Sequence, residues 1–254
     1  MKYLLYPFYI IWTIWCAFVF FLLALAMFPF LYVGVTFGGP KTIRAMHYLP
    51  CYVAQIALFL WGVRVVEHHK ERIDKNRQFI FVGNHRSYVD ALISGQVIKN
   101  FKKYIGKAEV LKWPVLGYLL DKLYIPVQRD NKDYRAWSME QLYVKAKEGA
   151  SIVIFPEGTS NNTNKLLKHF HDGAFRLAIP TKIPIAVFTI IGAGEIWHRD
   201  TILIKPGKVE VYWSEIIEMD TYNSLENDIE KLKDRVIHTM LPILEKHYPA
   251  GYEL

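Results

Sequence analysis

The sequence predicts an α/β fold, in which a largely parallel β-sheet with flanking helices is preceded by N-terminal membrane-associated helices. Three observations predict it: the first 66 residues are strongly apolar, the remainder alternates between short apolar runs and longer amphipathic segments, and polar motifs follow two of these runs. Alternating strands and helices are typical of parallel sheets, whose carboxyl ends gather ligands. We therefore expect a membrane anchor over residues 1–66 and one α/β domain over residues 67–254.

The anchor is predicted from two apolar stretches. No charged residue occurs from Tyr3 to Pro40, and residues 8–28 contain only Thr13 as a polar side chain. About 20 apolar residues are enough to span a bilayer. A cleaved signal peptide is the alternative, but its apolar region is usually about 7–15 residues long. The second stretch, Tyr48 to Val66, predicts either a membrane helix that completes a hairpin or a helix packed on the soluble domain.

Short apolar runs predict the strands, because they are rich in β-branched and aromatic residues. They lie at residues 79–83, 102–106, 124–127, 151–155, 183–190 and 209–213. Helices are expected up to Ile98, from Glu109 to Leu123, from Lys132 to Glu148 and from about Asp172. A last helix follows the candidate N-cap Ser224, and Pro242 is expected to kink or end it.

The heptapeptide NHRSYVD, from Asn84 to Asp90, directly follows the first of these strands. A histidine whose second ring nitrogen is bonded to a carboxylate is suited to act as a general base. Five residues along one helix would set His85 and Asp90 about 140° apart, so we expect His85 in the loop and Asp90 in the first helical turn. A purely structural helix-terminal aspartate beside a partly buried histidine is the alternative.

A second polar turn, PEGTSNN from Pro156 to Asn162, follows the run SIVIF. A glycine-containing turn with a carboxylate and two hydroxyls at the end of a strand exposes backbone N–H groups to a polar ligand. The alternative is an ordinary exit from a strand. The two turns together predict a site at the carboxyl edge of the sheet.

In order and spacing, these segments resemble the glycerolipid acyltransferase family, which includes lysophosphatidic acid acyltransferases. The resemblance covers roughly residues 79–187. Four blocks carry it: NHxxxxD at Asn84, His85 and Asp90; a weaker block at Gly106, Lys107 and Arg129; FPEGT at Phe155 to Thr159; and a proline-led strand at Ile183 to Val187.

The resemblance implies acyl transfer to a lipid hydroxyl without a metal or a bound cofactor. His85 would deprotonate the acceptor hydroxyl, which attacks the thioester of acyl-CoA or acyl-carrier protein, while Asp90 holds the imidazole. It also implies a hydrocarbon tunnel beneath the site. The residues implied in substrate binding are Asn84, Lys107, Arg129, Glu157, Gly158 and Thr159.

The expected acceptor is the lysophospholipid 1-acylglycerol-3-phosphate, which would give phosphatidate. Many phosphatidate-forming relatives carry an arginine directly after FPEGT, whereas this chain continues with Ser160, Asn161 and Asn162. Neither serine nor asparagine can replace the bidentate charge of arginine on a phosphate. A lysolipid with a larger headgroup or a lyso-amino-acid lipid is therefore an alternative acceptor. A catalytically silent lipid-binding membrane protein is an alternative from another class.

The net charge and the other reactive side chains narrow the range of functions that we expect. The net charge of +7 favours anionic membrane lipids and a phosphate-rich donor, and nucleic acid is not expected because no stacking motif accompanies it. Ser87 lacks a GxSxG elbow and is not expected to be a nucleophile. Cys16 and Cys51 lie in apolar stretches, and no histidine pair has metal-ligand spacing, so neither a disulfide nor a metal site is expected. By family analogy, the expected location is the bacterial inner membrane, with the catalytic domain on the cytoplasmic face.

Overall fold

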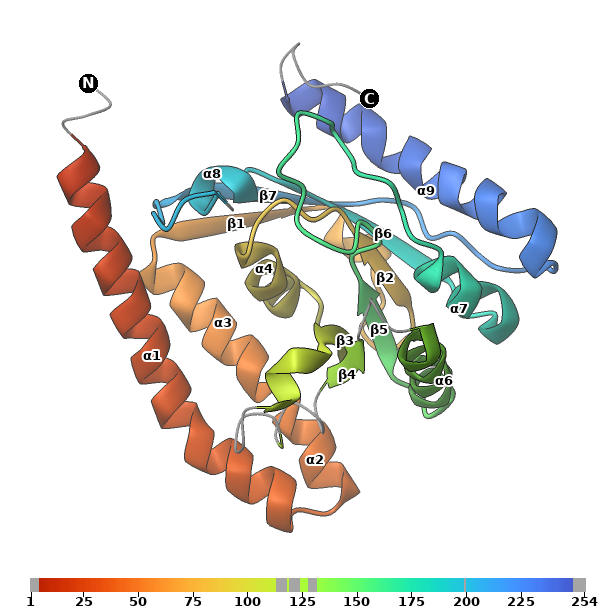
Figure 1. Ribbon diagram of the computed structural model, residues 1–254, viewed down its shortest axis with the longest axis horizontal. Helices are drawn as coiled ribbons and strands as arrows, with labels where there is room; N and C mark the ends of the chain where they lie inside the picture. Colours follow the sequence, from red (N-terminus) through yellow and green to blue (C-terminus); the bar gives the residue numbers. More distant parts are fainter. Residues whose placement is uncertain (1–4, 113–117, 119–123, 128–131, 199, 249–254) are drawn as a thin grey trace.

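The computed structural model describes residues 5–112, 118, 124–127, 132–198 and 200–248. Within this part of the chain, a seven-stranded sheet has the order β1-β7-β6-β2-β5-β3-β4 (Figure 1). All neighbouring strands are parallel except β6 and β7, which are antiparallel. The predicted α/β fold class is therefore confirmed.

The strands match the predicted apolar runs, with one addition. Their bounds are β1 Val63–His68, β2 Ile80–Gly83, β3 Lys102–Lys107, β4 Tyr124–Val127, β5 Ser151–Ile154, β6 Ile185–Ile191 and β7 Gly207–Trp213. The helices are α1 Tyr6–Phe37, α2 Pro40–Met46, α3 Leu49–Leu60, α4 Val89–Val97, α6 Lys132–Lys147, α7 Gly173–Thr181, α8 Ala193–Ile196 and α9 Leu225–His247, with short 3-10 helices η1 Lys70–Arg72 and η2 Ala108–Lys112.

Strand β1 corrects the interpretation of the second apolar stretch, which was expected to be helical as far as Val66. Helix α3 ends at Leu60, and Gly62 then adopts a positive φ of 65°, which favours glycine. The following valines are β-branched and pair in parallel with β7. Because β1 belongs to the sheet, the α/β unit begins before the domain boundary expected after residue 66.

Two other helix predictions meet the structure only in part. Of the helix expected from Glu109 to Leu123, the structure describes the 3-10 helix η2 at its start and Tyr118, which is helical, whereas residues 113–117 and 119–123 lie outside the described part. Helix α9 begins as expected, since the Ser224 hydroxyl accepts a hydrogen bond from the Asn227 N–H at 3.3 Å. It continues through Pro242 to His247 because buried residues on both sides of the proline, including Met240 and Leu244, hold it on the core.

The two faces of the sheet carry separate hydrophobic cores. Helices α6, α7 and α9 contribute to the core on one face. Helices α1, α3, α4 and α8 contribute to the core on the other face, where Cys16 of α1 and Trp61 after α3 are buried together. The Trp61 indole N–H donates to the Cys16 carbonyl at 3.0 Å, so the N-terminal helices are tied to each other beside the domain.

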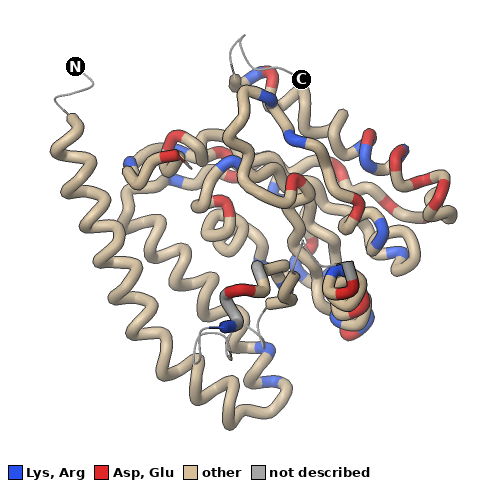
Figure 2. Tube along the Cα trace, viewed as in Figure 1, with Lys and Arg blue, Asp and Glu red and all other residues tan. Residues whose placement is uncertain are grey.

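The N-terminal helices present an apolar surface. Helices α1 and α3 lie side by side along one flank of the molecule (Figure 1). Segments Tyr6–Phe37 and Pro40–Leu60 are long and apolar enough to cross a membrane, judged by length and composition. Figure 2 shows no charged residue along α1, whereas charges are frequent on α9 and α6. Large apolar side chains such as Phe21, Phe30 and Phe37 are more than two-thirds exposed, which weakly suggests membrane association.

Candidate active site

The two predicted polar turns meet at the carboxyl edge of the sheet. Strand β2 ends at Gly83 and the neighbouring parallel strand β5 ends at Ile154, so the segments that follow emerge side by side. A side chain at Gly83 would collide with the Phe188 ring, whose Cζ atom is 2.3 Å from the position of an added Cβ. Glycine at this position therefore lets β6 pack closely where the NHRSYVD loop begins.

The predicted contact between His85 and Asp90 is present. The His85 Nδ1 atom lies 2.8 Å from the Asp90 Oδ2 atom, with His85 in the loop and Asp90 in the first turn of α4. The same oxygen accepts hydrogen bonds from the main-chain N–H groups of Arg86 and Ser87, each at 2.7 Å. Asp90 is 1% exposed, so this loop is wrapped around one buried carboxylate oxygen.

This contact fixes the tautomer of His85. A carboxylate oxygen can only accept, so in the neutral imidazole Nδ1 carries the proton and Nε2 keeps its lone pair. The His85 side chain is 21% exposed, and its ring packs on Phe155 with ring centroids 4.7 Å apart. The imidazole is therefore held on one side and remains reachable from outside, as a general base requires.

Glu157 joins the two loops, although it was expected near the acceptor headgroup. Its Oε1 atom accepts from the His85 N–H at 2.7 Å, and its Oε2 atom accepts from the Lys168 N–H at 2.9 Å. The residue is 3% exposed, and burial raises the pKa of its carboxyl to about 7. Since both oxygens face main-chain donors, Glu157 positions the His85 loop in this structure.

Asn84 has a structural position, although it was expected to bind substrate. Its Nδ2 group donates to the Ile190 carbonyl at 2.9 Å, and its Oδ1 atom accepts from the Ile190 N–H at 2.7 Å. The side chain is completely buried. Both polar groups are thus occupied in fixing the start of the loop to strand β6.

Gly158 and Thr159 lie on the side of the turn that reaches solvent. Gly158 has a positive φ of 73°, and its N–H closes the turn on the Phe155 carbonyl at 3.0 Å. Thr159 is exposed, and its hydroxyl accepts from the Lys168 ammonium at 2.9 Å. The Asn161 N–H donates to the His85 carbonyl at 2.6 Å, so the turn lies directly beside the histidine.

Two predicted residues have no described side-chain position. Lys107 is the last residue of β3, and only its backbone is described. Arg129 lies outside the described residues. Their implied roles therefore stay predictions.

The alternative chemistries find little support in the geometry. The Ser87 hydroxyl is completely buried and donates to the Trp197 carbonyl at 2.6 Å, so it is not presented to a substrate. Cys16 and Cys51 are free thiols. Across the described ranges, no group of three or more His, Cys, Asp or Glu residues could hold a metal ion.

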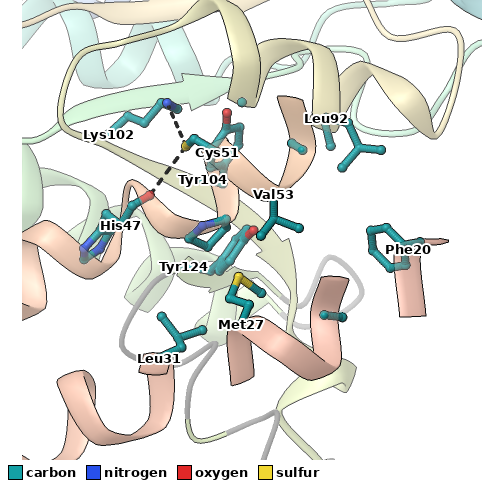
Figure 3. Close-up of a pocket in the computed structure, with 15 residues that line it drawn as sticks. Phe20, Met27, Leu31, His47, Cys51, Val53, Leu92, Lys102, Tyr104 and Tyr124 are labelled. Carbon is teal, nitrogen blue, oxygen red and sulfur yellow. Dashed lines mark hydrogen bonds between the residues drawn. The ribbon is translucent and has the colours of Figure 1, made fainter. Parts of the chain in front are cut away.

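An apolar cavity of about 230 Å³ lies between helices α1, α3 and α4 and the edge of the sheet (Figure 3). Ala91, Leu92 and Gly95 line it from α4, the helix that carries Asp90 in its first turn. The family resemblance implied a tunnel, but the sequence alone identified none of its lining residues. Ala91 and Gly95 are small residues four apart on one face of α4, and this spacing is a signal that could have identified part of the wall.

One wall of this cavity is polar. Lys102 is only 4% exposed, and its ammonium donates to the Cys51 thiol at 3.3 Å (Figure 3). The ammonium also donates to the Ile98 carbonyl. Burial lowers the pKa of the Lys102 ammonium. Lys103, the neighbour of Lys102, is also buried, so neither lysine belongs to a solvated basic surface.

The fold and the site together define a class of protein: an α/β protein with a histidine–aspartate pair at the carboxyl edge of a parallel sheet, beside an apolar cavity. The acyltransferase family model matches residues 64–191, which is about half of the chain. The chain belongs to this acyltransferase family and is an enzyme of the acyltransferase class. The resemblance found in the sequence is thereby confirmed.

Curated relatives with named activities are similar to this chain over much of its length. The 1-acyl-sn-glycerol-3-phosphate acyltransferase of Limnanthes alba is 26% identical over 203 residues, covering 78% of this chain and 70% of the relative. The human 1-acyl-sn-glycerol-3-phosphate acyltransferase alpha is 25% identical over 191 residues, covering 74% of this chain and 66% of the relative. The lyso-ornithine lipid O-acyltransferase of Rhizobium meliloti (strain 1021) is 30% identical over 142 residues, covering 54% and 47%.

The fold is also that of a solved structure. The crystal structure of the 1-acyl-sn-glycerophosphate (LPA) acyltransferase PlsC from Thermotoga maritima matches with a TM-score of 0.72 at 20% identity. The match covers 92% of this chain and 97% of that protein, so the N-terminal helices belong to the shared architecture.

Proposed function

We propose that this chain is a membrane-bound O-acyltransferase that moves a fatty acyl group from an acyl thioester to the free hydroxyl of 1-acylglycerol-3-phosphate, giving phosphatidate for phospholipid biosynthesis. The observation that carries the proposal is the 2.8 Å contact between His85 Nδ1 and Asp90 Oδ2, which leaves Nε2 of a partly exposed imidazole as a base. The relatives named for this acceptor support the choice of substrate.

The reaction needs no covalent enzyme intermediate. Nε2 of His85 takes the proton of the acceptor hydroxyl while the hydroxyl oxygen forms a bond to the thioester carbonyl carbon. The carbon–sulfur bond then breaks, and the thiol of acyl-CoA or acyl-carrier protein leaves with a proton returned by the imidazolium. Asp90 stabilises the imidazolium throughout. By family analogy, Lys107 stabilises the oxyanion and Arg129, Gly158 and Thr159 bind the acceptor headgroup.

The apolar cavity is proposed to hold a hydrocarbon chain of a substrate. Its walls come from α1, α3, α4 and strands β3 and β4, and they include Phe20, Met27, Leu31 and Val53 (Figure 3). The lining residues Ala91 and Leu92 directly follow Asp90 in the chain, which puts the cavity within one helical turn of the catalytic carboxylate. Burying methylene groups there would supply binding energy of about 0.8 kcal/mol for each group.

Membrane attachment is proposed to occur through α1 and α3, whose exposed apolar side chains suit a lipid environment. The insoluble acceptor and product are then delivered and released within the same bilayer. In a bacterial cell this would be the inner membrane, with the catalytic domain on the cytoplasmic face.

One observation favours a second acceptor. Ser160, Asn161 and Asn162 follow Thr159, and Asn161 uses its side chain within the loop, donating to the Lys165 carbonyl at 3.0 Å. No bidentate phosphate ligand is thus supplied at this point of the turn. A lyso-amino-acid lipid or a lysophospholipid with a larger headgroup is therefore the second candidate, and the similarity to a lyso-ornithine lipid O-acyltransferase supports it.

The test measures transfer of a labelled palmitoyl group from CoA, and in parallel from acyl-carrier protein, to a panel of lysolipids in detergent micelles. His85→Ala is expected to lower kcat by about 100-fold or more, as for a removed general base. His238→Ala, which removes an exposed histidine of α9, serves as the matched control and should leave kcat unchanged.

The panel separates the candidate acceptors. Product from lysophosphatidate would support the leading proposal, and product chiefly from another lysolipid would support the second candidate. No product from any lysolipid, or an equally active His85→Ala variant, would contradict both and favour a silent lipid-binding protein.

A further inference from the structure

Arg86, the neighbour of the proposed catalytic histidine, joins three segments that are far apart in the sequence. Its main-chain N–H donates to Asp90 Oδ2 at 2.7 Å. Its guanidinium donates to the Lys165 carbonyl at 2.6 Å, on the loop that follows the EGT turn. The guanidinium also lies over the ring of Tyr248, with Cζ 4.7 Å from the ring centroid. Arg86 is only 8% exposed, so these contacts hold a buried charge.

Tyr248 caps the C-terminus of α9, directly after His247, and this end of the helix is itself fixed. The Tyr248 N–H donates to the Leu244 carbonyl at 2.9 Å, and its hydroxyl is 3.5 Å from the Gly192 N–H after strand β6. The preceding His247 donates through Nδ1 to the Ile243 carbonyl at 2.8 Å and accepts from the Tyr212 hydroxyl at 3.1 Å. The Tyr248 ring is therefore presented to Arg86 from a firmly held position.

From this chain of contacts we propose that Tyr248 is a positioning residue, which keeps the His85–Asp90 pair in its reactive geometry by holding the guanidinium of Arg86. This inference rests on the acyl transfer proposed above. Tyr248 acts through Arg86 and touches neither His85 nor Asp90 in the contacts described.

The physical reason lies in how Asp90 is held. Its Oδ2 atom is fixed by His85, by the Arg86 N–H and by the Ser87 N–H. A guanidinium that loses its aromatic partner gains access to water, and it then moves the main-chain N–H of the same residue. The carboxylate turns with that N–H, and the imidazole turns with the carboxylate. Misplacement by about 1 Å can cost about 100-fold in rate.

The test compares variants of the full chain in detergent micelles. Tyr248→Ala is expected to lower kcat by about 10- to 100-fold while KM for both substrates stays unchanged, because geometry at the reacting atoms is lost and binding is not. Tyr248→Phe keeps the ring over Arg86 and should retain the wild-type kcat.

The matched control is Tyr143→Ala on α6. Tyr143 is also half-buried, and its ring also faces a cation, with the Lys147 Nζ atom 4.6 Å from its centroid, but it contacts no residue of the NHRSYVD loop in the hydrogen bonds and ring contacts described. Tyr143→Ala should lower the Tm as much as Tyr248→Ala does and leave kcat unchanged. A double-mutant cycle with Arg86→Met should be non-additive, with the double variant losing no more activity than the worse single variant.

A second readout does not depend on turnover. The Nδ1 proton of His85, which is shared with Asp90, should give a low-field imidazole resonance in the NMR spectrum of the wild type, Tyr248→Phe and Tyr143→Ala proteins. This resonance should broaden or vanish in Tyr248→Ala. The inference would be overturned if Tyr248→Ala left the resonance and kcat unchanged. It would also be overturned if the activity losses in the double-mutant cycle were additive, or if Tyr143→Ala lowered kcat as much as Tyr248→Ala does. A wild type that shows the resonance but acylates no lysolipid would instead contradict the proposed function.

Discussion

Replacing Asp90 with asparagine removes one negative charge while keeping the shape of the side chain. The carboxamide oxygen can occupy the position of Oδ2 and still accept from the Arg86 and Ser87 N–H groups, which are each 2.7 Å from that atom in the wild type. The loop is therefore expected to keep its conformation. What the variant loses is the attraction between the carboxylate and the imidazolium that forms on His85 during proton transfer.

The size of this loss follows from the geometry. With 2.8 Å between Nδ1 and Oδ2, the centres of the two charges lie about 4 Å apart. Such a pair attracts by about 4 kcal/mol at an effective dielectric constant of about 20. In the transition state the proton is partly transferred, so about 2–4 kcal/mol acts on the rate, which corresponds to roughly 30- to 1000-fold in kcat.

Asp228→Asn is a matched control for this measurement. Oδ2 of Asp228 on α9 also accepts hydrogen bonds from two main-chain N–H groups at the start of a helix, those of Asn223 and Ser224 at 2.8 and 2.9 Å. In the described part of the chain, no histidine contacts this carboxylate. Steady-state acyl transfer should show kcat falling in Asp90→Asn and unchanged in Asp228→Asn. The reasoning is refuted if Asp90→Asn retains the wild-type kcat, or if both variants lose activity equally.

Three further predictions concern the surroundings of the site. Burial raises the pKa of the Glu157 carboxyl from 4.5 to about 7, so the folded protein binds the carboxyl proton more tightly than the unfolded chain does. The protonated carboxyl therefore contributes fully to stability below pH 4.5, and this contribution is lost as the pH rises through about 7. The free energy of unfolding of the wild type should therefore fall by about 2.5 kcal/mol more than that of Glu157→Gln between about pH 5 and pH 8, as measured by denaturant unfolding. Parallel pH profiles of the two proteins would contradict this. Ala24→Phe places a ring at the cavity wall and should disfavour long acyl chains by about 2 kcal/mol, which is roughly 30-fold in kcat/KM. The control Ala26→Phe, on the exposed side of α1, should leave the chain-length preference unchanged. Equal effects of the two substitutions would argue against the cavity as the site of the acyl chain. Ser87→Ala should lower the free energy of unfolding by about 1 kcal/mol, because the hydrogen bond to the Trp197 carbonyl is lost, and should leave kcat near that of the wild type. A loss of kcat as large as that of His85→Ala would instead support a serine nucleophile.

Much of the fold could be predicted because its signals are local. The runs FIFVG and SIVIF are apolar and β-branched, and strands of this kind occupy the centre of a parallel sheet whatever lies elsewhere in the chain. Strand β1 was missed because its valines continue an apolar stretch, and a glycine with a positive φ separates it from α3. Local patterns do not show where an apolar helix gives way to an apolar strand.

The contact between His85 and Asp90 could also be predicted from local sequence, since the two residues are five apart and a strand-to-helix turn can bring them together. The positions of Asn84 and Glu157 could not be predicted in this way. Asn84 bonds to Ile190, 106 residues away, and Glu157 bonds to the His85 N–H, 72 residues away. A polar residue in a functional motif has the same sequence signature whether it faces a substrate or the backbone of another strand.

By itself, the sequence determined the apolar character of the N-terminal helices, the alternation of strands and helices, and the placing of a histidine and an aspartate at the end of a strand, because each depends on residues within a few positions of one another. Only the tertiary structure decided that β2 lies beside β5, that Glu157 and Asn84 hold the loop, that α1, α3 and α4 enclose a cavity, and that Tyr248 reaches Arg86. The physical reason is that these contacts depend on which surfaces of the strands and helices pack together, and packing is a property of the whole folded chain.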